Sequence, residues 1–394
     1  MVKVLNIIPN TTGVGKYRMI DRYNYIRNNL SERVEIKYVM AEAFAINPYC
    51  CKGYDVIHIH ETSCAYLDGF MLIKKHNPTA KVIVDINDYW VCIKELQHYT
   101  NYVINGLNKK TLYALQNADY VTTTTEYFRK ELLKQNKNVI VIKNVINENE
   151  NQVKTTKTKD KRLRVGILCS SAHYADVKLL QGMVNILKPE IDKIKFVVCG
   201  FDLNHIITYT DAQGNTRQRL ATFEENLWCD FERILTDNYS IVSPEYKTYL
   251  GSLTKYTYPY ESLEPYSRRW TKDIDNYLTH YDYLDVLLVP LVDTKPCHYK
   301  SELKLVEAGY KNTAVICQDL TPYSSVAKGK DIAILMNKKS KAKDWAKEIK
   351  KLLNNPERVT QLQENLSVFI KENYKMSIEA EKIVDIYTDK LWKI

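Results

Sequence analysis

The fold of this chain follows from residues 148–176, which read ENENQVKTTKTKDKRLRVGILCSSAHYAD. The first half of the stretch, 148–161, has a single apolar side chain, Val153, and cannot contribute to a hydrophobic core. An apolar run over 163–169, a small polar turn and the start of a helical pattern at Asp176 follow directly. A new strand-helix pattern therefore starts after the polar segment. We expect two domains joined by a linker at residues 151–162.

On both sides of the linker, short β-branched runs alternate with helical patterns, which favours parallel sheets with right-handed crossovers. The sequence predicts an α/β fold with Rossmann-like domains at residues 1–150 and 163–375. Strands are expected at 2–8, 33–39, 56–59, 82–86, 120–124, 139–142, 163–169, 196–199, 285–290 and 314–317. Helices are expected at 16–30, 109–118, 126–135, 176–187, 223–235 and 301–311.

Two segments depart from this alternation. Residues 204–283 are aromatic and charged, and we expect them to form an insertion on the second domain. Residues 376–394 lack Gly and Pro and predict a C-terminal helix that packs back across to the first domain.

Composition excludes some classes of protein. The 394 residues carry 56 basic and 47 acidic side chains, a net charge of +9, and no apolar run approaches the roughly 18 residues that span a bilayer. The start of the chain reads as a buried strand and not as a signal peptide, so we expect a cytoplasmic protein. Residues 328–351 hold nine lysines against three acids. This run is typical of a solvated helix face, and an anionic membrane surface or nucleic acid is the alternative partner.

A glycine-containing turn follows the first predicted strand, with Gly13 and Gly15 ahead of Arg18. It completes neither a Walker A loop nor a dinucleotide fingerprint. A glycine turn at a helix N-terminus still suits a phosphate or sugar oxygen, so these residues are candidates for ligand binding. The alternative is a tight turn that binds nothing.

Polar residues also follow the next strands, where ligands gather in open α/β sheets. His60 and Glu61 end one strand, and Asp88 follows another. Asp88 could activate an acceptor hydroxyl, or it could serve only in turn or capping chemistry. His58 is better assigned to the core.

In the second domain, Ser171 and His173 follow the first strand and predict an anion-binding turn. Lys304 and Glu307 lie three residues apart and share one face of a helix. A lysine beside a diphosphate and a carboxylate beside a ribose would lie about one helical turn apart. An ordinary surface ion pair has the same spacing.

Together these residues resemble the GT-B nucleotide-sugar glycosyltransferases, especially glycosyltransferase family 4 and related bacterial and phage enzymes. The resemblance is carried by Gly13 to Gly15, by 55–60, by 118–126 with 141–144, by 170–176 and by 300–309. It implies two domains facing a central cleft, with an acceptor bound by the first and a UDP- or GDP-linked sugar bound by the second. It also implies that Lys304 contacts the diphosphate and Glu307 the ribose, with no cofactor or metal required.

The chain departs from that family at two places. Tyr299 stands eight residues before Glu307, where the family has its first glutamate, and the nearest acid is Glu302. A basic pair common after the first strand of the second domain is missing. Diphosphate binding then rests on Ser171, His173 and Lys304, with Lys300 nearby.

The resulting hypothesis is a retaining, metal-independent glycosyltransferase of surface-glycan or similar glycoconjugate synthesis. Its acceptor is a glycan, a lipid-linked molecule or another hydroxyl compound, with peripheral membrane contact allowed by the basic charge. His60 assists the acceptor or binds the transferred sugar, and Asp88 is the base if the reaction inverts. The alternatives are a phage-type transferase that modifies DNA and a non-catalytic nucleotide-sugar-binding protein.

Overall fold

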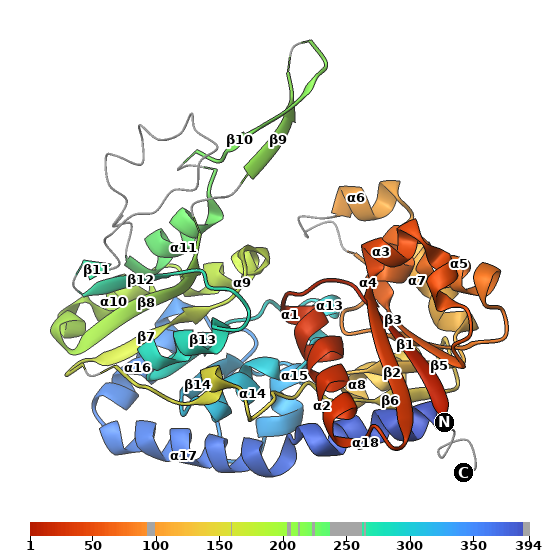
Figure 1. Ribbon diagram of the computed structural model, residues 1–394. Coiled ribbons are helices and arrows are strands. Elements are labelled where there is room, and N and C mark those ends of the chain that lie inside the picture. Colours follow the sequence, from red (N-terminus) through yellow and green to blue (C-terminus); the bar gives the residue numbers. More distant parts are fainter. Residues whose placement is uncertain are drawn as a thin grey trace.

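The computed structural model describes residues 1–92, 99–158, 160–202, 206–211, 213–222, 225–236, 262–263 and 265–388 (Figure 1). Two α/β units are built on separate sheets, the first over β1 to β6 and the second over β7 to β15. Among the described residues between 142 and 162, none is part of a strand. No helix in the described part of the chain is both long and apolar enough to cross a membrane.

The first sheet has the strand order β2-β1-β3-β4-β5-β6, and all neighbours are parallel. The order reverses between β1 and β3, so the loops after these two strands lie at the topological switch point. The strands are β1 (Val2–Ile8), β2 (Val34–Met40), β3 (Val56–His60), β4 (Lys81–Asp85), β5 (Tyr120–Thr123) and β6 (Val139–Val141). The helical segments are α1 (Gly13–Gly15), the π-helix η1 (Lys16–Ile20), α2 (Asp21–Asn29), α3 (Ala41–Ile46), η2 (Pro48–Cys51), α4 (Glu61–Leu67), α5 (Gly69–His76), α6 (Tyr99–Ile104), α7 (Leu107–Asn117) and α8 (Glu126–Leu132).

The second sheet has the order β11-β12-β8-β7-β13-β14-β15, parallel except for the pair β11 and β12. Its switch point lies between β7 and β13. The strands are β7 (Leu163–Leu168), β8 (Ile194–Phe201), β11 (Ser262–Leu263), β12 (Tyr266–Trp270), β13 (Val286–Val289), β14 (Ala314–Gln318) and β15 (Ile334–Met336). The helical segments are η3 (Asn151–Val153), η4 (Ser171–His173), α9 (Tyr174–Val177), η5 (Lys178–Leu180), α10 (Met183–Leu187), η6 (Lys188–Lys193), α11 (Leu227–Thr236), η7 (Tyr277–Tyr283), α13 (Lys295–His298), α14 (Leu303–Tyr310), α15 (Thr321–Ala327), α16 (Ala342–Leu353), α17 (Pro356–Asn373) and α18 (Met376–Tyr387).

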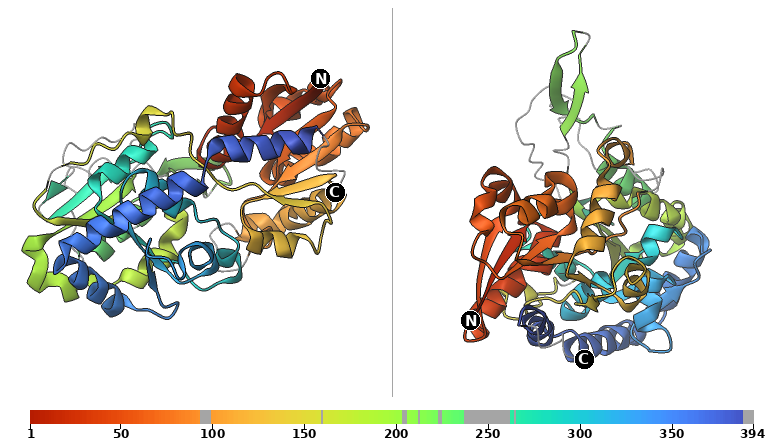
Figure 2. Two further views of the ribbon diagram at one scale, coloured as in Figure 1. Left: turned by 90° about the horizontal axis from the view of Figure 1, so that it is seen from below. Right: turned by 90° about the vertical axis from the view of Figure 1, so that its right-hand side faces the viewer.

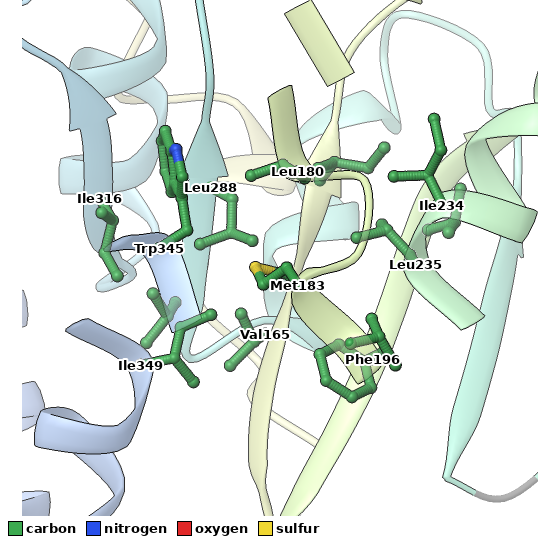
Figure 3. Packing of buried hydrophobic residues seen from close by; sticks show 14 of the residues in the cluster. Val165, Leu180, Met183, Phe196, Ile234, Leu235, Leu288, Ile316, Trp345 and Ile349 are labelled. Atoms are coloured by element: carbon green, nitrogen blue, oxygen red, sulfur yellow. The ribbon is translucent and has the colours of Figure 1, made fainter. Parts of the chain in front are cut away.

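Strand residues alternate between two hydrophobic cores, one on each face of a sheet. In β13, Val286 and Leu288 belong to one core of the second unit, whereas Leu287 and Val289 belong to the other. Figure 3 shows the first of these cores, in which helix residues such as Trp345 pack against Leu288 and its neighbours. Trp345 is fully buried, so the lysine-rich helix α16 turns its apolar side inward.

The predicted strands agree with the observed ones to within two residues at each end, but the structure also contains elements that the sequence analysis did not predict, such as β15, α4 and α5. Within the expected insertion, β12 pairs with β8 and is therefore a strand of the second sheet. The same region contains the antiparallel hairpin of β9 (Ile206–Thr210) and β10 (Thr216–Leu220), which projects away from both sheets (Figure 1). The helix expected at 176–187 is interrupted at Gly182, whose backbone is left-handed with φ of 90°.

The C-terminal helices connect the two units, as the fold prediction required. Helix α17 packs on α14 and β14, and α18 packs on α2 (Figure 2). Gly309 of α14 allows the close approach of α17, because a Cβ there would lie 2.5 Å from Ile370. In α18, Ile383 lies in a core of the first unit, and the Tyr387 hydroxyl lies 2.8 Å from His58 Nδ1.

Truncation of Ile383 to alanine tests whether α18 is part of the first domain's core. Ile383 is 2% exposed, so we expect Ile383→Ala to lower the free energy of unfolding by roughly 2–4 kcal/mol. Ile378→Ala, on the same helix at 47% exposure, is the matched control and should change it by less than about 0.5 kcal/mol. Urea unfolding measures both, and equal effects would contradict the docked position of α18.

Candidate functional site

The two units meet at the carboxyl ends of their strands. Lys300, which follows β13, places its Nζ 3.8 Å from Oδ1 of Asp88, which follows β4. Asn144, which follows β6, donates from Nδ2 to Oγ of Ser301 at 2.8 Å. Loops at the carboxyl ends of both sheets therefore come together, on the side where open α/β sheets bind ligands.

Lys304 and Glu307 follow closely after Lys300, on the first two turns of α14. The Glu307 carboxylate is 1% exposed and accepts hydrogen bonds at Oε2 from Lys304 Nζ at 2.8 Å and from the Tyr281 hydroxyl at 2.7 Å. Lys304 Nζ also contacts the Tyr277 hydroxyl at 2.6 Å. Burial alone would lower the pKa of Lys304, but the Glu307 charge and the Tyr277 hydroxyl outweigh it and raise that pKa. The pair is thus a partly buried cation, with 20% of its side chain exposed, beside a fully buried carboxylate, unlike an exposed surface pair.

The turn after β7 brings His173 to the same place. His173 Nδ1 lies 2.7 Å from Asp176 Oδ2, and Asp176 Oδ1 accepts from the backbone N–H of Val292 at 2.8 Å. Ser171 begins the short helix η4 that ends at His173. The Asp176 carboxylate therefore connects the turn after β7 to the segment after β13.

Positive charge gathers around this turn. Burial lowers the pKa of His173, and the nearby charges of Lys300 and Lys304 lower it further against the effect of Asp176. Burial would also lower the pKa of Lys300, but Asp88 outweighs it and raises that pKa. Two lysines and an imidazole form a group that suits a phosphate.

The glycine turn of the first domain reaches the junction through the residues that follow it. A Cβ on Gly15 would lie 1.7 Å from the carbonyl oxygen of Asn10, so only glycine fits there, whereas Gly13 has no heavy atom within 4 Å of such a Cβ. The π-helix η1 then buries Lys16, Tyr17 and Arg18 in succession.

Arg18 forms a buried ion pair with Asp85, the last residue of β4. Its Nε and Nη2 donate to the two carboxylate oxygens at 2.9 and 2.5 Å, and Nη1 donates to Ile142 O and Asn144 Oδ1. Burial by itself raises the pKa of Asp85, but the charge and hydrogen bonds of Arg18 outweigh it and leave that pKa well below its usual range. All four of these hydrogen bonds from Arg18 lie within the first domain.

His60 lies at the carboxyl end of β3 and is fully buried. Its Nδ1 is 2.9 Å from Thr62 Oγ1 and its Nε2 is 2.7 Å from Asn87 Oδ1. Burial lowers the pKa of His60, so the ring is neutral at pH 7. Asp88 next to Asn87 has a side chain that is 56% exposed, and it accepts from Asn87 Nδ2 at 2.7 Å.

Glu61, the first residue of α4, is buried behind His60. Burial, followed by the charges of Asp88 and Asp85, raises the pKa of Glu61 to about 8. Its Oε2 has no hydrogen-bond partner among the described residues. The Glu61 carboxyl group is therefore protonated at neutral pH.

Tyr299 and Glu302, the two residues that the resemblance compared with a first glutamate, lie away from the Lys304 and Glu307 pair. Tyr299 is 6% exposed and stacks on Tyr89 of the first domain, with ring centroids 4.7 Å apart and an angle of 17° between the rings. Glu302 is 3% exposed and accepts from the Tyr374 hydroxyl at 2.8 Å. Tyr299 thus joins the domains, and Glu302 attaches α14 to the chain after α17.

The sequence analysis missed three tyrosines that surround Glu307. Tyr277 and Tyr281 come from η7, at the end of the expected insertion, and Tyr17 comes from the first domain. The sequence contains 30 tyrosines, but this count did not indicate which of them would lie near Glu307.

Among the described residues, no three His, Cys, Asp or Glu side chains lie close enough together to hold a metal ion.

The two Rossmann-like units, their facing switch points and the crossing C-terminal helix define a GT-B fold. Solved structures with this arrangement include sucrose-phosphate synthase from Thermosynechococcus elongatus, with 13% identity, a TM-score of 0.63 and 100% of both chains covered. Anabaena HepE in complex with UDP and glucose shares 11% identity with a TM-score of 0.62, over 99% of this chain and 100% of that one. A glycosyltransferase from Rickettsia africae shares 12% identity with a TM-score of 0.60, over 100% and 99%. No protein-family model and no curated protein matches the sequence.

The raised pKa of Glu61 predicts how stability depends on pH. The folded state holds this proton more tightly than the unfolded state does, so its contribution to stability falls as the pH rises from about 4.5 toward 8. Glu61→Gln removes the titration, and we expect the variant to gain stability over the wild type between pH 5 and pH 8, on the order of a few kcal/mol.

Urea unfolding of both proteins across that pH range measures the difference. Glu126→Gln is the matched control, because Glu126 is also the first residue of a helix but its side chain is 70% exposed. A Glu61→Gln difference that stays constant with pH would show that Glu61 is ionised in the folded protein.

Proposed function

We propose that this chain is a glycosyltransferase that moves a sugar from a nucleotide-diphosphate-sugar to an acceptor hydroxyl. The observation that carries the proposal is the pair of Lys304 with the buried Glu307 at the carboxyl edge of the second sheet. Support also comes from the GT-B fold, because the Anabaena HepE structure that shares it was solved with UDP-glucose. The donor proposed here is UDP- or GDP-linked.

The second domain, over residues 163–375, binds the donor in this proposal. Glu307 accepts hydrogen bonds from the ribose, in place of those from Tyr281 and Lys304. Lys304, Lys300 and His173 face the diphosphate, and Ser171 adds a hydroxyl and a backbone amide. The positive charges of Lys304 and Lys300 stabilise the leaving diphosphate without a metal ion.

The first domain, over residues 1–150, binds the acceptor. A retaining transfer is favoured because His60 has both ring nitrogens bonded and Glu61 is protonated, so neither is a ready base. The bond between the anomeric carbon and the diphosphate oxygen breaks, and the acceptor oxygen bonds to that carbon on the same face. The acceptor proton passes to the leaving diphosphate oxygen. His60 and Asn87 then position the transferred sugar.

Asp88 is the alternative base. Its carboxylate is exposed at the junction of the domains and lies next to Lys300. An inverting reaction would use Asp88 to take the acceptor proton while water is excluded from the site. The configuration of the product distinguishes the two reactions, and an inverted product would overturn the retaining assignment.

The exposed lysines of α16 support peripheral contact with an anionic surface, as suits a lipid-linked or glycan acceptor. They stand on the helix face opposite Trp345 and Ile349. Surface-glycan or similar glycoconjugate synthesis is the setting that we propose for the reaction.

Loss of the Lys304 and Glu307 pair tests the proposal. A nucleotide present at 100 times its dissociation constant should stabilise the wild type by about 2.7 kcal/mol. Glu307→Gln and Lys304→Ala should each weaken binding at least about 10-fold and abolish most donor turnover, because each removes a charged contact.

Lys351→Ala is the control for this experiment. Lys351 forms a 2.7 Å pair with Glu348, also three residues apart on a helix, but on the exposed face of α16. Thermal shift with UDP- and GDP-sugars, followed by donor turnover assays, provides the measurements. A wild type that responds to no nucleotide would overturn the proposed function, and binding without turnover on any acceptor would favour a non-catalytic binding protein.

A further inference from the structure

Tyr17 belongs to the first domain by sequence but packs in the second. It lies in η1, directly after the glycine turn, and its side chain is 4% exposed. The hydrophobic core around it is that of the second sheet, where its neighbours include Leu278 and Tyr281. The turn of the first domain therefore contributes a side chain to the half of the molecule that holds Glu307.

The hydroxyl of Tyr17 is buried without a hydrogen-bond partner among the described residues. Leaving such a group unpaired costs about 1–3 kcal/mol, so its position calls for an explanation. Burial raises the pKa of Tyr17, and the largest further causes are the charges of Glu307 and Tyr277. An unpaired donor thus lies near the carboxylate that Tyr281 and Lys304 already contact.

Lys16, the preceding residue, holds Tyr17 against the second domain. Its Nζ contacts Asp21, the first residue of α2, at 2.9 Å and Glu150, at the end of the first domain, at 2.5 Å. Asp275, two residues before Tyr277, lies 3.5 Å away. The position of Tyr17 is therefore determined by charged contacts on both sides of the domain junction.

We propose that Tyr17 is a donor-binding residue contributed by the first domain, and that its hydroxyl hydrogen-bonds to a ribose hydroxyl of the nucleotide held by Glu307. The proposal rests on the proposed function and adds to it a contact from the opposite domain. Binding of the nucleotide satisfies the buried hydroxyl of Tyr17 and links the glycine turn to α14. Ribose recognition thereby becomes a property of both domains together.

A comparison of Tyr17→Phe with the wild type tests this contact by calorimetric titration. The probe is UDP, or GDP if that is the nucleotide bound, together with its 2′-deoxy and 3′-deoxy analogues. We expect Tyr17→Phe to bind the ribonucleotide about 10-fold more weakly. With the analogue that lacks the contacted hydroxyl, the variant and the wild type should have the same affinity.

Tyr23→Phe is the control, since Tyr23 is also buried but packs in a core of the first unit. Thermal unfolding of the free protein should leave Tyr17→Phe as stable as the wild type or more stable, because only an unpaired hydroxyl is lost. Equal weakening toward the ribonucleotide and both deoxy analogues would overturn the proposal, as would unchanged affinity for all three.

The same titrations separate this inference from the function on which it rests. Nucleotide binding by the wild type that Glu307→Gln weakens and Tyr17→Phe does not would overturn the role of Tyr17 and leave the proposed function standing. A wild type that binds no nucleotide would overturn both.

Discussion

The buried ion pair between Arg18 and Asp85 is the interaction on which the arrangement at the domain junction depends. Burying two charges is costly, and removal of one partner leaves the other uncompensated. Four hydrogen bonds offset that cost, and they fix the ends of β4 and β6 together with Asn144. Asn144 in turn bonds Ser301, two residues before α14 begins. The position of Lys304 and Glu307 relative to the first domain therefore depends on a charge pair that touches neither residue.

The π-helix at 16–20 explains how one short segment can serve both domains. Three of its buried side chains have different partners: Lys16 bonds Glu150 at the end of the first domain, Tyr17 packs in the second unit, and Arg18 bonds the first sheet. Short π-helical segments are rare in proteins, and those that occur are often found at functional sites. The close fit of Gly15 against Asn10 sets where this segment starts. Together these constraints give the glycine turn a structural role that is independent of any phosphate.

Much of the fold could be predicted because its strands are apolar on both faces, and because a polar linker separates two repeats of the same pattern. Strand β12 was missed because it contains Arg268 and Arg269, which argue against a buried strand. The tertiary structure makes it possible, since Arg268 pairs with the buried Glu232 of α11. The proximity of Lys304 and Glu307 could be predicted because both residues lie on one helix, three residues apart. The tyrosines near Glu307 were not, because Tyr281 is 26 residues away in sequence and Tyr17 lies in the other domain.

Tyr299 stands where the family that the sequence resembles has a glutamate, and its side chain has a different role. A glutamate there could accept hydrogen bonds from a sugar, whereas Tyr299 lies against Tyr89 and Phe128 inside the first domain. Lys295 adds to this contact, with its Nζ 4.8 Å from the centre of the Tyr89 ring. The segment before α14 thus joins the two domains through the contact of Tyr299 with aromatic side chains of the first domain. Any relative motion of the domains must either preserve this contact or disrupt it. Charge recognition in the proposed donor site then depends on Lys300 and Lys304, with His173 as a hydrogen-bonding group, and recognition of ribose hydroxyl groups depends on Glu307.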